Sequence, residues 1–355
     1  MKTTYSCFLA SMVFTLLIVG CKNDATRKGQ AVTTTDFQVL VVEQGGDQVK
    51  LFHSDGRLLD SIQVGFNPHE IEFDSSTQRV YVSNFGVEDY DTTIGIPGTT
   101  LSVFDLKDLS NVQYWPTYRT HGKVPDTCKA PHGLKLRPPT KKELFVNLEY
   151  GDSMMVYDAQ KGGIKRSFPL AKGVHNFEFS SSGDRIWSLA GANGVYTYNA
   201  VTGEELDHFP TATPVRGMTF TSDRQQLILS CLNEIYMIST ADLSIQKHFT
   251  DLGVKQIIYS CLSPDERLLL APCPYDGLVL ALDLETGEIL ERIATGKAPI
   301  YVRIAPNGTQ AFVSNALDNH MSIIELSDFN VRPFGKVYKP NGFLFLKPSQ
   351  GQAVE

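Results

Sequence analysis

An all-β fold made of a tandem repeat is predicted for this chain of 355 residues by two observations. Four consecutive segments each contain four short strand-like runs, separated by turns rich in Gly, Pro, Asp and Asn. Residues at the same place in the first run of these segments stand 41, 42 and 42 positions apart: Phe179, Phe220, Leu262 and Ile304. A period near 42 with four strands per unit is typical of the blades of a β-propeller.

The same phase extends toward the N-terminus. Leu136 lies 43 residues before Phe179, and Phe73 lies 63 residues before Leu136, so the second unit carries about twenty additional residues. The first unit begins at Asp36 with FQVLVVEQ, which matches the second strand of a blade. Its inner strand is therefore missing from the N-terminal end.

The C-terminus contains a candidate for the missing strand, PNGFLFLK at 340–347, in which Phe345 stands 41 residues after Ile304. We therefore predict seven four-stranded antiparallel blades over residues 36–348. The C-terminal strand completes the first blade, which covers both free sheet edges. Residues 349–355 are predicted to be a short tail.

Composition excludes one class of function. The chain has 39 acidic and 32 basic side chains, a formal net charge of −7, and no run of Lys and Arg. Nucleic-acid binding depends on clustered positive charge. Nucleic acid is therefore not an expected partner.

The N-terminus has the features of a signal peptide. Lys2 precedes an apolar run at 7–20, which is too short to span a membrane comfortably. The run ends in LIVGC, which resembles a bacterial lipobox. That resemblance implies a lipoprotein signal peptide at 1–20, lipidation of Cys21 and a lipidated tether at 21–35. The alternative is ordinary cleavage, which leaves a secreted protein without an anchor.

The residue after the lipidated cysteine indicates a destination. It is Lys22, whereas an Asp there resembles an inner-membrane retention signal. We therefore expect the cell envelope of a Gram-negative bacterium, at the outer membrane. Four further cysteines would lie in a compartment that permits disulfides, but none forms a CxxC pair and no disulfide is predicted: Cys128, Cys231, Cys261 and Cys273.

Several repeats carry recognisable short motifs. They include TQRVYVSN at 77–84, TQAFVSN at 309–315, DLETGE at 283–288 and Pro-His-Gly at 131–133. These motifs resemble YVTN-type propeller repeats, which occur in YncE-like proteins and in lactonase-type propellers. The resemblance covers the whole mature body and implies the fold much more specifically than it implies an activity.

The repeat phase also predicts where a site lies. The residues that open the inner strands should meet at one face, and in ring order they are Asn341, His69, His132, His175, Arg216, Ile258 and Ile300. The mouth of the channel is therefore predicted to have a polar arc of three His and one Arg, opposite an apolar arc. The next position adds four polar or aromatic side chains: Glu70, Asn176, Tyr259 and Tyr301.

Two long segments of the second unit are predicted to be loops that rise on the same face, at 85–100 and 111–130. Trp115 and Tyr118 are the aromatic residues of the second loop that we select as ligand contacts, because long loops on a rigid scaffold often form binding sites. Glu149, just past the second strand of the third unit, is expected at the same rim.

The favoured hypothesis is a binding module. Arg216 would bind a carboxylate or phosphate, and the three His would orient a small polar or anionic ligand. Tyr259, Tyr301 and the loop aromatics would supply a stacking surface. A loop of a partner protein is the alternative occupant of this mouth.

An enzyme similar to lactonases or lyases is the second hypothesis. His132 or His175 would transfer a proton and Arg216 would stabilise an oxyanion. Glu149 or Glu70 would orient a His. A metal-dependent version would bind a transition metal through His69, His132 and His175 with a carboxylate. A third hypothesis, a structural spacer in a surface complex, needs neither a ligand nor a reaction.

Overall fold

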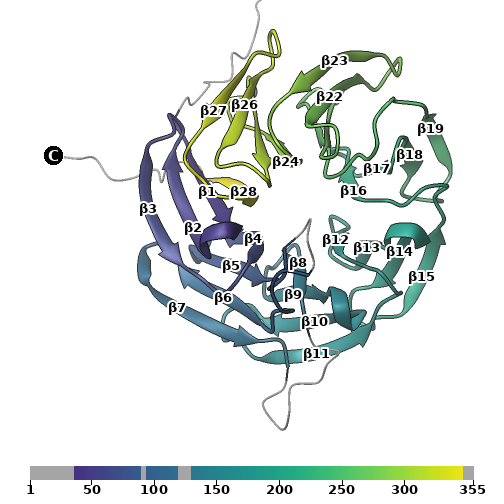
Figure 1. The fold of residues 1–355 in the computed structure, drawn as a ribbon. Coiled ribbons are helices and arrows are strands. Elements are labelled where there is room, and N and C mark those ends of the chain that lie inside the picture. Colours follow the sequence, from purple (N-terminus) through teal and green to yellow (C-terminus); the bar gives the residue numbers. More distant parts are fainter. Residues whose placement is uncertain (1–35, 89–92, 119–128, 347–355) are drawn as a thin grey trace, which may run out of the picture. The chain divides into compact units, whose positions relative to one another are not determined.

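Seven blades surround a central axis in the computed structural model, which describes residues 36–88, 93–118 and 129–346 (Figure 1). These residues belong to one compact unit. Each blade is a four-stranded antiparallel sheet, so the predicted all-β, seven-bladed β-propeller is confirmed. The predicted signal peptide at 1–20, the tether at 21–35 with Cys21, and the tail at 349–355 lie outside the described residues.

We number the blades 1 to 7 in chain order, with β1 in blade 1. The inner strands of blades 1 to 7 are β28 (Pro340–Leu346), β4 (Pro68–Asp74), β8 (Pro131–Leu136), β12 (Asn176–Phe179), β16 (Gly217–Phe220), β20 (Cys261–Leu262) and β24 (Pro299–Ile304). The second strands are β1 (Gln38–Glu43), β5 (Arg79–Asn84), β9 (Glu143–Leu148), β13 (Arg185–Leu189), β17 (Gln226–Ser230), β21 (Leu268–Cys273) and β25 (Gln310–Asn315).

The outer half of each blade is equally regular. The third strands are β2 (Gln48–His53), β6 (Thr100–Asp105), β10 (Ser153–Asp158), β14 (Val195–Asn199), β18 (Ile235–Ser239), β22 (Leu278–Asp283) and β26 (Met321–Glu325). The outermost strands are β3 (Leu58–Gln63), β7 (Asp108–Pro116), β11 (Ile164–Pro169), β15 (Glu205–Phe209), β19 (Ile245–Phe249), β23 (Ile289–Ala294) and β27 (Val331–Phe334).

The helices of the described residues are single 3-10 turns that connect second and third strands: η1 (Gln44–Gly46), η2 (Glu149–Gly151) and η3 (Gly191–Asn193). Within the described ranges, no helix is both long and apolar enough to pass through a bilayer.

The ring closes as the sequence predicts. β28 pairs antiparallel with β1, with Val39 opposite Phe345 and Val41 opposite Phe343. In Figure 1 the yellow C-terminal strand therefore lies beside the purple N-terminal strands. Without this pairing, one edge of β1 would expose unpaired backbone groups.

Hydrophobic seams between blades hold the ring together. Seven of the core clusters each combine side chains of two neighbouring blades, and together they cover all seven junctions. The second strands are buried at all positions but the first, and the third strands are mostly buried except β2. The outermost strands bury at most one residue each. A blade therefore cannot bury its faces alone, which is the reason that the repeats must stack.

Four inner strands begin in the same unusual way. The residue before an initial proline has a positive φ between 44° and 59° in blades 1, 2, 3 and 7: Lys339, Asn67, Ala130 and Ala298. After each of these prolines the inner strand contains one more residue than the partner strand opposite it, which is a β-bulge. A bulge changes the direction of the side chains that follow, often beside functional sites.

The prediction of a loop over 111–130 is wrong in its first part. Strand β7 continues to Pro116, with Leu101 opposite Trp115 and Val103 opposite Gln113. Residues 113–116 pair one by one with β6, and Trp115 packs against blade 3, so the segment extends the sheet.

Glu143 joins three cations at the edge of blade 3. Its carboxylate lies 2.7 Å from the Arg166 guanidinium, 2.7 Å from Lys165 Nζ and 3.1 Å from Arg137 Nη1. Arg166 also donates a hydrogen bond to the carbonyl of Ala200 in blade 4. Burial opposes ionisation of Glu143, but these hydrogen bonds outweigh it and lower the pKa from 4.5 to about 2.

We predict that Glu143→Gln changes the acid dependence of stability. A carboxyl group with a lowered pKa stabilises the fold above its unfolded pKa, and this contribution is lost as the pH falls from 4.5 toward 2. The variant should therefore be less stable at pH 7 and lose less stability below pH 4.5, by up to about 1.4 kcal/mol per pH unit. Denaturant unfolding at a series of pH values measures both effects.

Glu288→Gln is the matched control, because Glu288 is an exposed carboxylate in the turn before β23. It should follow the wild-type curve. Parallel curves for Glu143→Gln and wild type below pH 4.5 would contradict the assigned role of Glu143.

Candidate functional site

The predicted polar arc exists as a chain of neighbouring side chains. His69 lies in β4, His132 in β8, and His175 directly before β12. The ring centroids of His69 and His132 are 4.1 Å apart, and those of His132 and His175 are 5.9 Å apart. All three residues are buried, with 4–6% of their surface exposed. Arg216, directly before β16, is exposed and makes no ion pair with any described residue.

Phe85 covers this arc. It is the first residue after β5, and its ring packs edge-on against His69 and His132 at centroid distances of 5.3 and 5.1 Å. The loop that begins with Phe85 is held by an ion pair of 2.6 Å between Glu88 and Lys339, the residue before β28. The described part of the 85–100 loop therefore lies at the predicted face. Sequence reasoning placed this loop there but did not single out Phe85.

Burial keeps the imidazoles of His132 and His175 neutral. Burial, together with the neighbouring His69 and His175, holds the pKa of His132 well below 6.5. Burial and the charge of Arg216 lower the pKa of His175 to about 3. At neutral pH these rings therefore offer lone pairs and N–H groups, and Arg216 supplies the positive charge of the arc.

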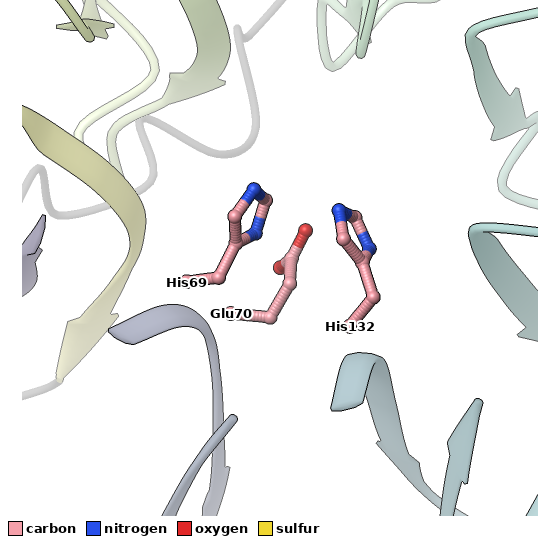
Figure 2. A group of neighbouring side chains, drawn as sticks. All are labelled: His69, Glu70 and His132. Atoms are coloured by element: carbon pink, nitrogen blue, oxygen red, sulfur yellow. The ribbon is translucent and has the colours of Figure 1, made fainter. Parts of the chain in front are cut away.

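Glu149 reaches the arc from η2. Its Oε2 lies 3.9 Å from Nε2 of His132, and the Glu149 side chain is partly exposed. Glu70 approaches from the other side, and it forms with His69 and His132 a group whose potential ligand atoms all lie within 4.8 Å of one another (Figure 2). His175 is not part of this group.

The residue that directly follows each position of the polar and apolar arcs belongs to a ring inside the channel, which we call the first channel ring. In blade order it consists of Gly342, Glu70, Gly133, Asn176, Gly217, Tyr259 and Tyr301. Glycine alternates with larger residues because neighbouring inner strands converge. A Cβ on Gly133 would stand 2.4 Å from Oδ1 of Asn176, and one on Gly217 would stand 2.4 Å from the backbone N of Tyr259.

The space left by these glycines lets blades that are not neighbours touch. Asn176 of blade 4 donates from Nδ2 to Oε1 of Glu70 in blade 2 at 3.1 Å, and is 3.3 Å from the hydroxyl of Tyr259 in blade 6. The rings of Tyr259 and Tyr301 pack at 5.4 Å. Burial and the nearby Glu70 raise the pKa of Tyr259 well above 10, so its hydroxyl stays protonated. These contacts divide the channel below the arc.

Two residues further along lies a second channel ring, in which four residues are charged: Glu72, Lys135, Glu178 and Arg303. Lys135 and Glu178 form an ion pair of 2.7 Å, and Arg303 donates to the hydroxyl of Tyr301 at 2.7 Å. Burial raises the pKa of Glu72. Lys135, Glu178 and Arg303 line a cavity of about 350 Å³, together with Tyr259, Tyr301 and Asn176 of the first ring.

The sequence contained a signal for the second ring that the sequence-based prediction did not use. Alternate residues of a strand point to the same side, so charged residues two positions after Glu70, Gly133, Asn176 and Tyr301 indicate a second polar layer. In a closed ring, a charged side chain on an innermost strand can reach water only in the channel.

The remaining predicted positions are placed as follows. Asn341 is buried at the start of β28, and its carbonyl accepts a hydrogen bond of 2.6 Å from Ser314. Ile258 and Ile300 form a small apolar cluster against which Tyr259 and Tyr301 pack, as the predicted apolar arc requires. Tyr118 is partly buried just beyond β7.

Trp115 is not at the mouth. Only 8% of its surface is exposed, and its ring stacks at 5.9 Å on Tyr157 of blade 3. It therefore belongs to the seam between blades 2 and 3, because β7 is longer than predicted and carries it into the core. Cys231, Cys261 and Cys273 are free thiols, and Cys128 lies outside the described residues.

Comparisons with known proteins support the fold. The sequence matches no model of a protein family, and no curated protein is similar to it in sequence. Solved structures do match. A 6-phosphogluconolactonase candidate from Bacteroides fragilis has a TM-score of 0.67 at 16% identity, over 90% of this chain and all of that chain.

Two other similar structures belong to proteins with different names. Hydrazine synthase of Kuenenia stuttgartiensis has a TM-score of 0.67 at 16% identity, covering 82% of this chain and 92% of that chain. The dihydro-heme d1 dehydrogenase NirN has a TM-score of 0.61 at 15% identity, covering 89% and 76%. At these identities the likeness is one of fold, so the chain is a seven-bladed β-propeller whose site must be interpreted from its own residues.

We predict that Gly133→Ala disrupts the first channel ring. The new methyl group would displace the amide of Asn176, which is 2.4 Å away, and separate it from Glu70 and Tyr259. Overpacking of this kind costs about 1–3 kcal/mol. Denaturant unfolding of the variant measures the loss.

A double-mutant cycle with Asn176→Ala tests the cause. Because Asn176→Ala removes the clashing amide, the double variant should be more stable than the sum of the two single changes predicts. Additive losses would show that the clash with Asn176 does not dominate, and would point instead to Asn147, whose Oδ1 lies 2.8 Å from the same Cβ position.

Proposed function

We propose that this protein is a lipid-anchored β-propeller of the cell envelope that binds a small polar or anionic ligand at the channel mouth. The observation that carries the proposal is the arc of His69, His132, His175 and Arg216, which lies on consecutive blades. A membrane is a partner only through the lipid on Cys21, and a partner protein's loop is the alternative occupant of the mouth.

Arg216 is the residue best suited to an anion. It is exposed and has no ion pair with a described residue, so its guanidinium is available for two parallel hydrogen bonds to a carboxylate or phosphate. The neighbouring His175 is neutral at pH 7 because burial and Arg216 lower its pKa to about 3. Arg216 therefore contributes charge, and the imidazoles contribute directed hydrogen bonds.

Tyr259 and Tyr301 of the first channel ring can contribute aromatic surface next to the arc. The cavity of about 350 Å³ is lined by none of the four arc residues and lies beyond the contacts of this ring, so the ligand proposed for the mouth does not depend on it.

A lactonase-like enzyme is the second candidate. Its support is the fold similarity to 6-phosphogluconolactonase candidates and the distance of 3.9 Å between Glu149 and His132, which allows the carboxylate to orient the imidazole. In that case His132 or His175 would transfer the proton and Arg216 would stabilise the oxyanion.

For the binding function we predict that the wild-type protein binds at least one of inorganic phosphate, citrate and gluconate. Arg216→Ala should weaken that binding about tenfold or more, because a hydrogen bond to a charged group contributes about 1.5–3 kcal/mol. Isothermal titration calorimetry measures the affinity. Arg267→Ala is the control, since Arg267 is an exposed Arg in the loop between β20 and β21.

Equal affinities of wild type and Arg216→Ala, or no binding of any of these anions, would contradict the anion-binding proposal. A panel of lactones and esters separates the second candidate. Turnover by the wild type that is lost in both His132→Ala and Arg216→Ala would make the mouth an active site.

For the anchor we predict that a Gram-negative host labels the wild-type protein with radioactive palmitate and retains it in the outer-membrane fraction. Cys21→Ser removes the thiol that the lipid requires, so the variant should be unlabelled. Cys128→Ser is a suitable control with normal labelling, because Cys128 does not follow the apolar run of the signal peptide. A processed wild-type protein without label would favour ordinary cleavage.

A further inference from the structure

Two histidines and one carboxylate of neighbouring blades converge beside the axis. His69 and Glu70 come from β4 and His132 comes from β8, and one ligand atom of each lies within 4.8 Å of the other two. Figure 2 shows the side chain of Glu70 between the two imidazole rings. All three residues are buried, with 4%, 6% and 5% of their surface exposed.

The backbone accounts for this convergence. Consecutive residues of a regular strand point to opposite sides, so His69 and Glu70 should not share a site. The bulge after Pro68 inserts one residue between the pairs Pro68–Asn84 and Ile71–Val82, and both His69 and Glu70 fall within it. The equivalent bulge after Pro131 contains His132. In blade 4 the backbone N–H of His175 donates to the carbonyl of Leu189, which is also opposite Asn176, and His175 is not part of the group.

One polar atom of this group is buried without a partner. Nδ1 of His132 is buried and has no hydrogen-bond partner among the described residues. A buried polar atom without a partner costs about 1–3 kcal/mol, and such atoms in native structures point to a ligand or another function.

The surroundings also have the features of a supporting shell. Asn176 donates to Oε1 of Glu70 at 3.1 Å, and the backbone N–H of Glu70 donates to Ser83 Oγ at 3.0 Å. Phe85 packs against both imidazoles and limits the access of water. Hydrogen bonds that orient ligating side chains are a regular part of metal sites.

We propose that His69, Glu70 and His132 bind one divalent first-row transition metal ion, with Zn²⁺ the best match to two imidazoles and one carboxylate. A tetrahedral zinc ion holds its ligand atoms about 3.4 Å apart. Binding would therefore move the ligand atoms closer together by about 1 Å, through rotation of the side chains. Three protein ligands leave a coordination position for water or for an anion. This site goes beyond the binding function proposed above, which requires no metal.

The proposal replaces His175 of the predicted triad with Glu70. The geometric reason is the bulge in β4: Glu70 lies on the channel side in regular alternation with Glu72, and the extra residue turns His69 to the same side. It also follows that His175 and Arg216 stay available for a ligand at the mouth.

The test uses the full chain, purified with a tag that contains no histidine and treated with a chelator that is then removed. Zn²⁺ should bind with a stoichiometry of one per chain and raise the melting temperature, because an ion that binds the folded state stabilises it. His69→Ala, Glu70→Gln and His132→Ala should each weaken Zn²⁺ binding about tenfold or more. His175→Ala should change the affinity less than about threefold.

His208→Ala is the matched control, because His208 is an exposed His of β15 whose Nε2 contacts the carbonyl of Asn193. It should bind Zn²⁺ as the wild type does. Visible absorption of the Co²⁺-loaded wild type reports the ligand geometry without any variant, which keeps the test decisive if a variant does not fold. No Zn²⁺ binding by the wild type, or unchanged binding in both Glu70→Gln and His132→Ala, would overturn the proposal.

The zinc proposal and the anion-binding proposal can be refuted independently of each other. Arg216→Ala should leave the Zn²⁺ stoichiometry at one even where anion binding is lost. Glu70→Gln should lose Zn²⁺, whether or not the mouth retains phosphate, citrate or gluconate.

Discussion

Pairing of β28 with β1 is the interaction on which the rest of this structure depends. It joins the two ends of the described chain and forces seven inner strands to converge on one axis. Each blade then has a neighbour on both sides, and the hydrophobic seams cover both of its apolar faces. The same closure brings residues of distant blades, such as Glu70 and Asn176, within hydrogen-bond distance.

Convergence at the axis also sets the chemistry of the channel. Glycine at Gly133 and Gly217 leaves room for the neighbouring Asn176 and Tyr259, so polar groups fill a space that could not hold seven large side chains. The enclosure keeps His132 and His175 neutral and pairs Lys135 with Glu178. The charge of the arc is therefore that of its exposed cation, Arg216.

Sequence reasoning reached the fold and the arc because both depend on repeat phase. Residues with the same phase, such as His69, His132 and Arg216, must occupy equivalent places in equivalent blades. Sequence reasoning failed where a local irregularity changes the phase of the repeat. The bulge after Pro68 turns His69 to the side of Glu70, and the extension of β7 to Pro116 carries Trp115 into a seam. The charged second channel ring, with Glu72 and Arg303, could have been predicted from the alternation of side chains along each inner strand.

The sequence by itself determined the number of blades, their strand order and the closure by the C-terminal strand, because a 42-residue period and the hydrophobic alternation are local and repeat along the chain. Tertiary structure alone decided which side chains meet at the axis. Those contacts join residues such as Asn176 and Tyr259, which lie 83 positions apart. Their distances depend on bulges, on the space beside glycines and on the approach of neighbouring strands, none of which the repeat pattern specifies.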